Sequence, residues 1–138
     1  MRRKIYFVLM LLWMGVIFWF SAQPAAESTQ TSLRVGRLVC GIFVSDYEKM
    51  SATEQTALAE NIEFPVRKAA HASEYALLGI LVFGVARKKE MTKRQMFCAI
   101  LVTVLYAASD ELHQLFVPGR SCQLRDVLID TAGAVAGG

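Results

Sequence analysis

Residues Ile5 to Phe20 read "IYFVLMLLWMGVIFWF" and indicate the class of protein before any other feature is considered. This run holds no charged residue and no proline, and it follows the basic block Arg2-Arg3-Lys4. A helix of this length covers about 24 Å, and Ser21 and Ala22 extend it towards the roughly 30 Å hydrocarbon core of a bilayer. No small-x-small cleavage pattern follows, so an uncleaved membrane span is favoured over a signal peptide.

The rest of the chain repeats this alternation of apolar runs and short polar blocks. Hydrophobic residues make up 54% of the sequence and charged residues only 20%. Two more runs, Ala69–Ala86 and Met96–Val117, are long enough to cross a bilayer, whereas Val127–Gly138 covers about 18 Å and is too short. We expect an all-α, polytopic integral membrane bundle with about four spans in a single domain over residues 1–138. The fourth span is incomplete, either because the sequence is truncated, which we favour, or because this helix is a half-span. A small soluble helical protein is the alternative.

A long polar segment, Gln23–Lys68, separates the first two spans. Ser51 and Glu54 have the spacing of a capping box, which predicts a helix starting there and running through Glu60. Phe64-Pro65 should end that helix, because proline disfavours the helical conformation of the residue before it. We therefore expect a long extracytoplasmic loop with short amphipathic helices on the membrane surface.

The basic residues predict how the chain is oriented. Eight of the 15 lysines and arginines lie in two short blocks, Arg2–Lys4 and Arg87–Arg94. Because such blocks mark the cytoplasmic side, we expect a multi-pass protein of the plasma membrane with a cytoplasmic N-terminus. The net charge of +3 does not indicate nucleic-acid binding, since the basic residues flank apolar runs and no aromatic–basic motif for bases is present.

Polar residues gather at the outer ends of the later spans. This orientation brings three helix ends to one depth in the outer leaflet, and each charge in the hydrocarbon costs roughly 2.5–3.5 kcal/mol. Such a grouping predicts a site. Its members are Arg67, Lys68, His71, Glu74, Asp110, Glu111, His113, Gln114, Arg120, Asp126 and Asp130.

The functional interpretation is a polar pocket for an anionic or polar head group, such as that of a lipid-linked cell-wall precursor. Arginine suits phosphate or carboxylate because it can donate two hydrogen bonds at once. The ligand-binding candidates are Arg67, Lys68, Glu74, His113, Gln114, Arg120, Asp126 and Asp130. Glu111, Asp110 and His71 are the candidate acids or bases, since desolvation raises the pKa of a carboxyl group towards neutrality. Whether the site is catalytic stays open.

Three other interpretations of the cluster compete with a ligand pocket. It could be a helix-locking network, with Arg120–Asp126 and Arg67–Glu74 as ion pairs. It could hold a divalent metal, but HxxE and ExH spacings are weak signals, and we predict no metal or cofactor. It could relay protons in a transporter, although the polar groups gather at one side rather than at the midplane.

The three cysteines give no further signal. Cys40, Cys98 and Cys122 show no CxxC spacing, so neither a disulfide framework nor a zinc finger is indicated. A Cys40–Cys122 pair is not favoured. The oligomeric state cannot be inferred from the sequence.

Three segments together resemble the VanZ-like family of bacterial integral membrane proteins. They are "FSAQP" (Phe20–Pro24), "RKAAHASEYALLG" (Arg67–Gly79) and "DELHQLFVPGRSCQLRDVLIDTAGAVAG" (Asp110–Gly137). The resemblance covers nearly the whole chain and implies a bundle of about four membrane helices. The family's name-giving member is associated with resistance to the glycopeptide antibiotic teicoplanin, which implies a role in the cell envelope but no established reaction. The family pattern falls on the eleven residues of the cluster and on Tyr75 and Gly133.

Overall fold

A computed structural model describes residues 1–87, 91–120 and 124–137. All regular elements in this part of the chain are helices, as the sequence predicts. They are α1 (Arg2–Ser21), α2 (Ala25–Phe43), the short 3-10 helix η1 (Tyr47–Lys49), α3 (Ala52–Ala86), α4 (Lys93–Gln114) and α5 (Leu124–Gly137).

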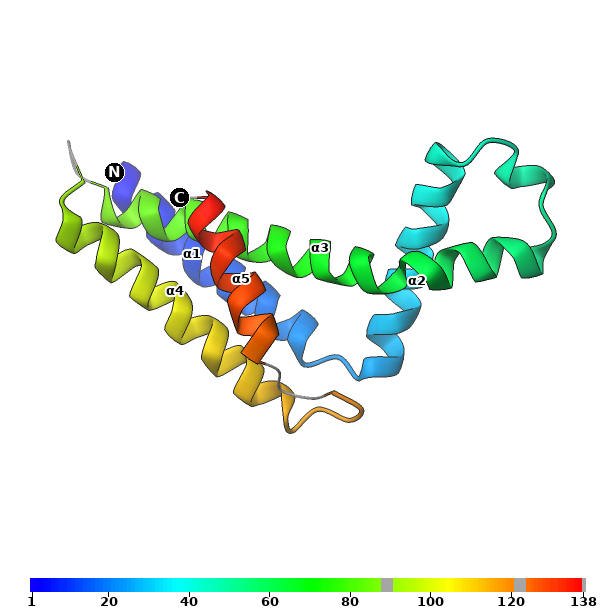
Figure 1. Ribbon diagram of the computed structural model, residues 1–138. Helices are drawn as coiled ribbons and strands as arrows, with labels where there is room; N and C mark the ends of the chain where they lie inside the picture. The colour runs from blue at the N-terminus through cyan, green and yellow to red at the C-terminus, as the bar shows by residue number, and fades with distance from the viewer. Residues whose placement is uncertain (88–90, 121–123, 138) are drawn as a thin grey trace.

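The helices form a bundle with an arm projecting from one end (Figure 1). The bundle consists of α1, α4, α5 and the second half of α3. The arm, as we name it, consists of α2, η1 and residues 52–66 of α3, with α2 running across α3 rather than alongside it. Because α3 belongs to both parts, it fixes the position of the arm.

Three of the helices have the length and composition of membrane spans. They are α1, α3 and α4. Their outward faces carry exposed apolar side chains, including Leu12, Trp19, Phe97 and Leu105, each at least 60% exposed. Such a surface suits lipid, because an α-helix makes its main-chain hydrogen bonds internally and exposes only apolar side chains there. Helix α5 is too short for this set, since its 14 residues rise about 21 Å.

Glycines bring α5 into main-chain contact with α3. A Cβ atom on Gly79 would lie 2.0 Å from the carbonyl oxygen of Ala134, and one on Gly137 would lie 2.0 Å from that of Ala76. Gly133 and Gly137 have the GxxxG spacing that allows such close packing. The contact places α5 firmly against the bundle.

The capping box is confirmed, but the predicted helix break is wrong. The Ser51 hydroxyl accepts from the Glu54 amide at 3.3 Å, and the Glu54 carboxylate accepts from the Ser51 amide at 2.8 Å. Helix α3 then continues through Pro65 as a single 35-residue helix instead of ending before it. Packing outweighs the lost hydrogen bond, because α2 holds the first half of α3, with Gly36 against Ala59, and the bundle holds the second half.

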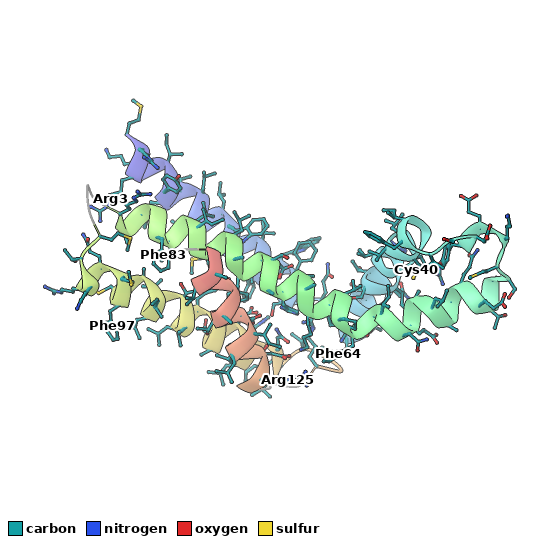
Figure 2. All side chains as sticks on the ribbon, turned by 45° about the horizontal axis from the view of Figure 1, so that its top comes forward. Arg3, Cys40, Phe64, Phe83, Phe97 and Arg125 are labelled. Carbon is teal, nitrogen blue, oxygen red and sulfur yellow. The ribbon has the colours of Figure 1, made fainter. Side chains whose placement is uncertain are left out.

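Described residues of the two basic blocks lie at the same end of the bundle. Arg3 of α1 and Arg94 of α4 line one cavity of about 490 Å³ together with Thr92 and Cys98. Figure 2 shows Arg3 at the opposite end of the molecule from Cys40, which lies in the arm. This arrangement is the one expected if α1, α3 and α4 each cross the membrane once.

Candidate functional site

A tight turn after α4 brings Arg120 back over the end of α1. The Arg120 amide donates to the Val117 carbonyl at 3.1 Å, and Gly119 adopts a φ of 76° that glycine readily accepts. The Arg120 side chain then reaches the last turn of α1. Its Nε donates to the Gln23 carbonyl at 3.0 Å and its Nη2 to the Phe20 carbonyl at 3.3 Å. The turn signal in the sequence therefore positions a cation at the polar end of the bundle.

Two neighbouring cavities share Arg67, His71 and Arg120 in their walls. The first is about 230 Å³ and lies between α1, α2 and α3; its other lining residues include Phe20, Gln23, Ser28, Thr31, Ser32 and Glu74. The second is about 280 Å³ and lies between α3, the turn and α5; its other lining residues include Ala25, Phe64, Lys68, Gln114, Gly119 and Asp126. We call the two together the outer cavities.

The three cations of the outer cavities have different partners. The Arg67 guanidinium donates to the Thr29 hydroxyl at 2.8 Å and forms an ion pair with Glu63. Lys68 forms an ion pair with Asp126. Within the described ranges Arg120 pairs with no carboxylate and donates only to main-chain oxygens. Burial and the nearby Arg67 charge lower the pKa of Arg120, although arginine stays protonated at neutral pH.

These ion pairs differ from those expected of a helix-locking network. Arg67 pairs with Glu63, one turn earlier on the same helix, and not with Glu74. Asp126 pairs with Lys68 and not with Arg120, because the turn directs Arg120 towards α1. The consequence is that Arg120 is left to face the cavities.

A stripe along α3 lines the first cavity. His71 Nδ1 lies 4.0 Å from a Glu74 carboxylate oxygen, as their spacing of three residues predicts. The Trp13 indole donates to the main-chain oxygen of Glu74 at 2.9 Å, which fixes α1 against this turn of α3. His71 and Glu74 are thus held side by side at the wall.

Cation–π contacts form beside the second cavity, where the arm joins the bundle. The Lys68 ammonium and the Arg125 guanidinium each lie 5.4 Å from the centre of the Phe64 ring. Figure 2 shows Phe64 and Arg125 close together, where α3 meets the start of α5. Cations at this distance from an aromatic face are attracted to it.

Three carboxyl groups of the predicted site are buried inside the bundle. Asp110, Glu111 and Asp130 are 3%, 1% and 1% exposed and line neither outer cavity. The Gln114 amide donates to Asp110 at 3.5 Å, whereas both Asp130 carboxyl oxygens lack a hydrogen-bond partner among the described residues. The proposed acid–base roles of Asp110, Glu111 and His71 stay predictions.

His113 also lies away from the outer cavities. Its ring packs on Phe18 of α1, with the ring centres 4.4 Å apart. It therefore contributes to the contact between α4 and α1. Its binding role stays a prediction.

Sequence reasoning missed the contribution of α2. Its run "STQTS", Ser28–Ser32, supplies four hydroxyl side chains, of which three line the first cavity and Thr29 binds Arg67. The run follows Pro24 and precedes an apolar segment. This order indicates the polar first turns of a helix, which could have placed the hydroxyl groups near the end of the first span. The described residues contain no group of three or more His, Cys, Asp or Glu that could hold a metal ion.

A family model described as VanZ/LLP1 matches residues 6–138. The chain belongs to the VanZ/LLP1 family. The resemblance drawn from the three sequence segments is therefore confirmed. With its three helices of membrane-spanning length, this VanZ/LLP1 chain is a VanZ-like membrane protein. Comparison with the curated proteins and with the solved structures finds no match.

The VanZ/LLP1 match extends over both the bundle and the arm. Helix α2 and the turn that carries Arg120 are therefore parts of the family domain. The cysteines add nothing to the site: Cys40 and Cys98 are free, and Cys122 lies outside the described residues.

Proposed function

We propose that this VanZ-like protein binds an anionic head group in the outer cavities, at the external face of the bacterial plasma membrane. A phosphate-bearing, lipid-linked cell-wall precursor fits this description. Through that contact the protein contributes to protection of the cell wall against teicoplanin. The external position follows from the two basic blocks at the other end, which favour the cytoplasm.

The arrangement of Arg120 carries the proposal. Two main-chain oxygens hold its guanidinium in place beside Arg67, and it forms no ion pair with a carboxylate in the described ranges, although three nearby carboxyl groups favour its charged form. A guanidinium has five N–H donors in a fixed plane, so its remaining donors can bind a phosphate or carboxylate. Arg67 lies in the wall that the two cavities share, and Lys68 lines the second cavity, so each places a further cation, already paired with a carboxylate, near the proposed ligand.

A bacterial susceptibility assay tests this function. A teicoplanin-sensitive bacterium would express the wild type, Arg120→Ala or Lys49→Ala at matched membrane abundance. Lys49→Ala is the control, because this substitution removes an equal charge from the exposed tip of the arm. We expect resistance from the wild type and Lys49→Ala, and its loss in Arg120→Ala. Equal resistance in all three would contradict a role for the outer cavities.

A helix-locking network is the second candidate, and the Lys68–Asp126 pair between α3 and α5 favours it. Under this alternative the polar end only stabilises the bundle. Arg120→Ala would then lower membrane abundance and thermal stability together with resistance. A stable but inactive Arg120→Ala protein distinguishes the binding function from the network.

A further inference from the structure

Helix α2 carries an apolar face that no described part of the chain covers. Gly36 and Cys40 face α3 and are buried. Val35, Leu38 and Ile42 are 42%, 69% and 76% exposed. Since successive helix residues are rotated by about 100°, these three lie on one face, turned away from the buried one.

The same face points towards the end of the bundle. Ser28 and Thr31 lie on the face of Val35 and Leu38, about two turns nearer the start of α2. Both line the first outer cavity together with Phe20 of α1. Figure 1 shows α2 running across α3 just beyond the end of α1. The apolar face is thus directed to the side on which the membrane-spanning part of α1 lies.

The position of α2 identifies the occupant of this face. Helix α1 is a membrane span, and α2 begins at Ala25, just after the end of α1 at Ser21. The other side of α2 carries exposed polar groups such as Gln30 and Arg37. A helix with apolar residues on one face and polar residues, including an arginine, on the other, tethered at a bilayer surface, is suited to lie in the interface.

We propose that α2 lies on the lipid leaflet at the polar end of the bundle, with Val35, Leu38 and Ile42 inserted among the lipids. The first outer cavity, between α2 and the end of α1, then opens to the head-group layer. A membrane-anchored ligand would reach Arg67 and Arg120 by lateral diffusion. That last consequence rests on the proposed function, whereas the location of α2 does not.

Site-specific fluorescence quenching tests the location of α2. The background protein would carry Cys98→Ser and Cys122→Ser and keep Cys40, which is buried. Bimane would label Leu38→Cys or, as the matched control on the opposite face, Arg37→Cys. The proteins would be reconstituted in vesicles of equal parts phosphatidylcholine and phosphatidylglycerol. Quenchers would be lipids with a doxyl group high on the acyl chain and iodide in the water.

We expect doxyl lipids to quench the label at position 38 at least about threefold more than the label at position 37, and iodide to show the reverse order. The result should be the same when the label is moved to Ile42. Equal quenching by iodide at positions 38 and 37 would overturn the proposal. Shielding of position 38 from both quenchers would also overturn it, by placing a protein surface or a second copy on this face. Neither result depends on ligand binding in the outer cavities.

Discussion

The α3–α5 contact and the outer cavities are neighbouring regions built on opposite principles. At the contact, Gly79 and Gly137 let main chains touch, so no space remains for a side chain. At the cavities, long charged side chains span gaps between elements, and Arg120 keeps unused hydrogen-bond donors. The α3–α5 contact therefore stabilises the fold, whereas the outer cavities keep hydrogen-bond donors that the fold does not use.

The largest effect is expected from adding one methyl group to the α3–α5 contact. In Gly79→Ala the new Cβ would lie 2.0 Å from the Ala134 carbonyl oxygen, which is main chain and cannot rotate away. We expect the free energy of unfolding to fall by about 3 kcal/mol or more. Thermal unfolding in detergent, followed by tryptophan fluorescence, measures the change.

Gly15→Ala is the matched control for this substitution. It lies in α1, and a Cβ there would meet nothing within 4 Å. We expect its stability to stay the same or rise slightly, because alanine favours helix over glycine. Equal melting temperatures for Gly79→Ala and Gly15→Ala would show that the main-chain contact does not stabilise the bundle.

A smaller effect is expected from the ion pair at the second cavity. The side chains of Lys68 and Asp126 are 17% and 18% exposed, whereas those of Lys49 and Asp46 are 81% and 65% exposed. A double-mutant cycle with Lys68→Met and Asp126→Leu should give a coupling of about 1–2 kcal/mol, since water screens this pair weakly. The same cycle on Lys49 and Asp46 should give under about 0.5 kcal/mol. Equal couplings would contradict the assigned burial.

The smallest effect is expected at Pro65. It lies exposed inside α3, where it cannot donate to the carbonyl of Asn61. Pro65→Ala restores that hydrogen bond but raises the conformational entropy of the unfolded chain. We therefore expect the free energy of unfolding to rise by about 1 kcal/mol. The measurement is the midpoint of thermal unfolding. A large loss of stability would instead show that the arm requires proline at this position.

Local patterns in the sequence predicted much of the fold. The apolar runs indicated the spans α1, α3 and α4, and the spacing of Ser51 and Glu54 indicated the start of α3. Each of these signals is contained within one element. Pro65 was misread because the contacts that keep α3 helical come from α2 and the bundle, which no local pattern contains.

The sequence predicted that His71 and Glu74 lie together, but it did not predict how the other polar residues of the cluster are paired or buried. Spacing along α3 correctly joined His71 to Glu74, because both lie on one helix. The partner of Asp126 could not be derived, since it depends on how α5 is rotated against α3. The deep burial of Asp110 and Glu111 and the hydroxyl face of α2 depend on packing between helices in the same way.

Ligand binding by purified protein tests the central claim, that the outer cavities bind an anion independently of folding. Farnesyl diphosphate and uncharged farnesol would be titrated calorimetrically into wild type, Arg120→Lys and Lys49→Ala in detergent. We predict that wild type and Lys49→Ala bind the diphosphate and not farnesol. Arg120→Lys should bind it at least about tenfold more weakly at a similar melting temperature, because lysine lacks the planar donor pair. Equal binding of farnesol and the diphosphate, or unchanged binding by Arg120→Lys, would contradict the account.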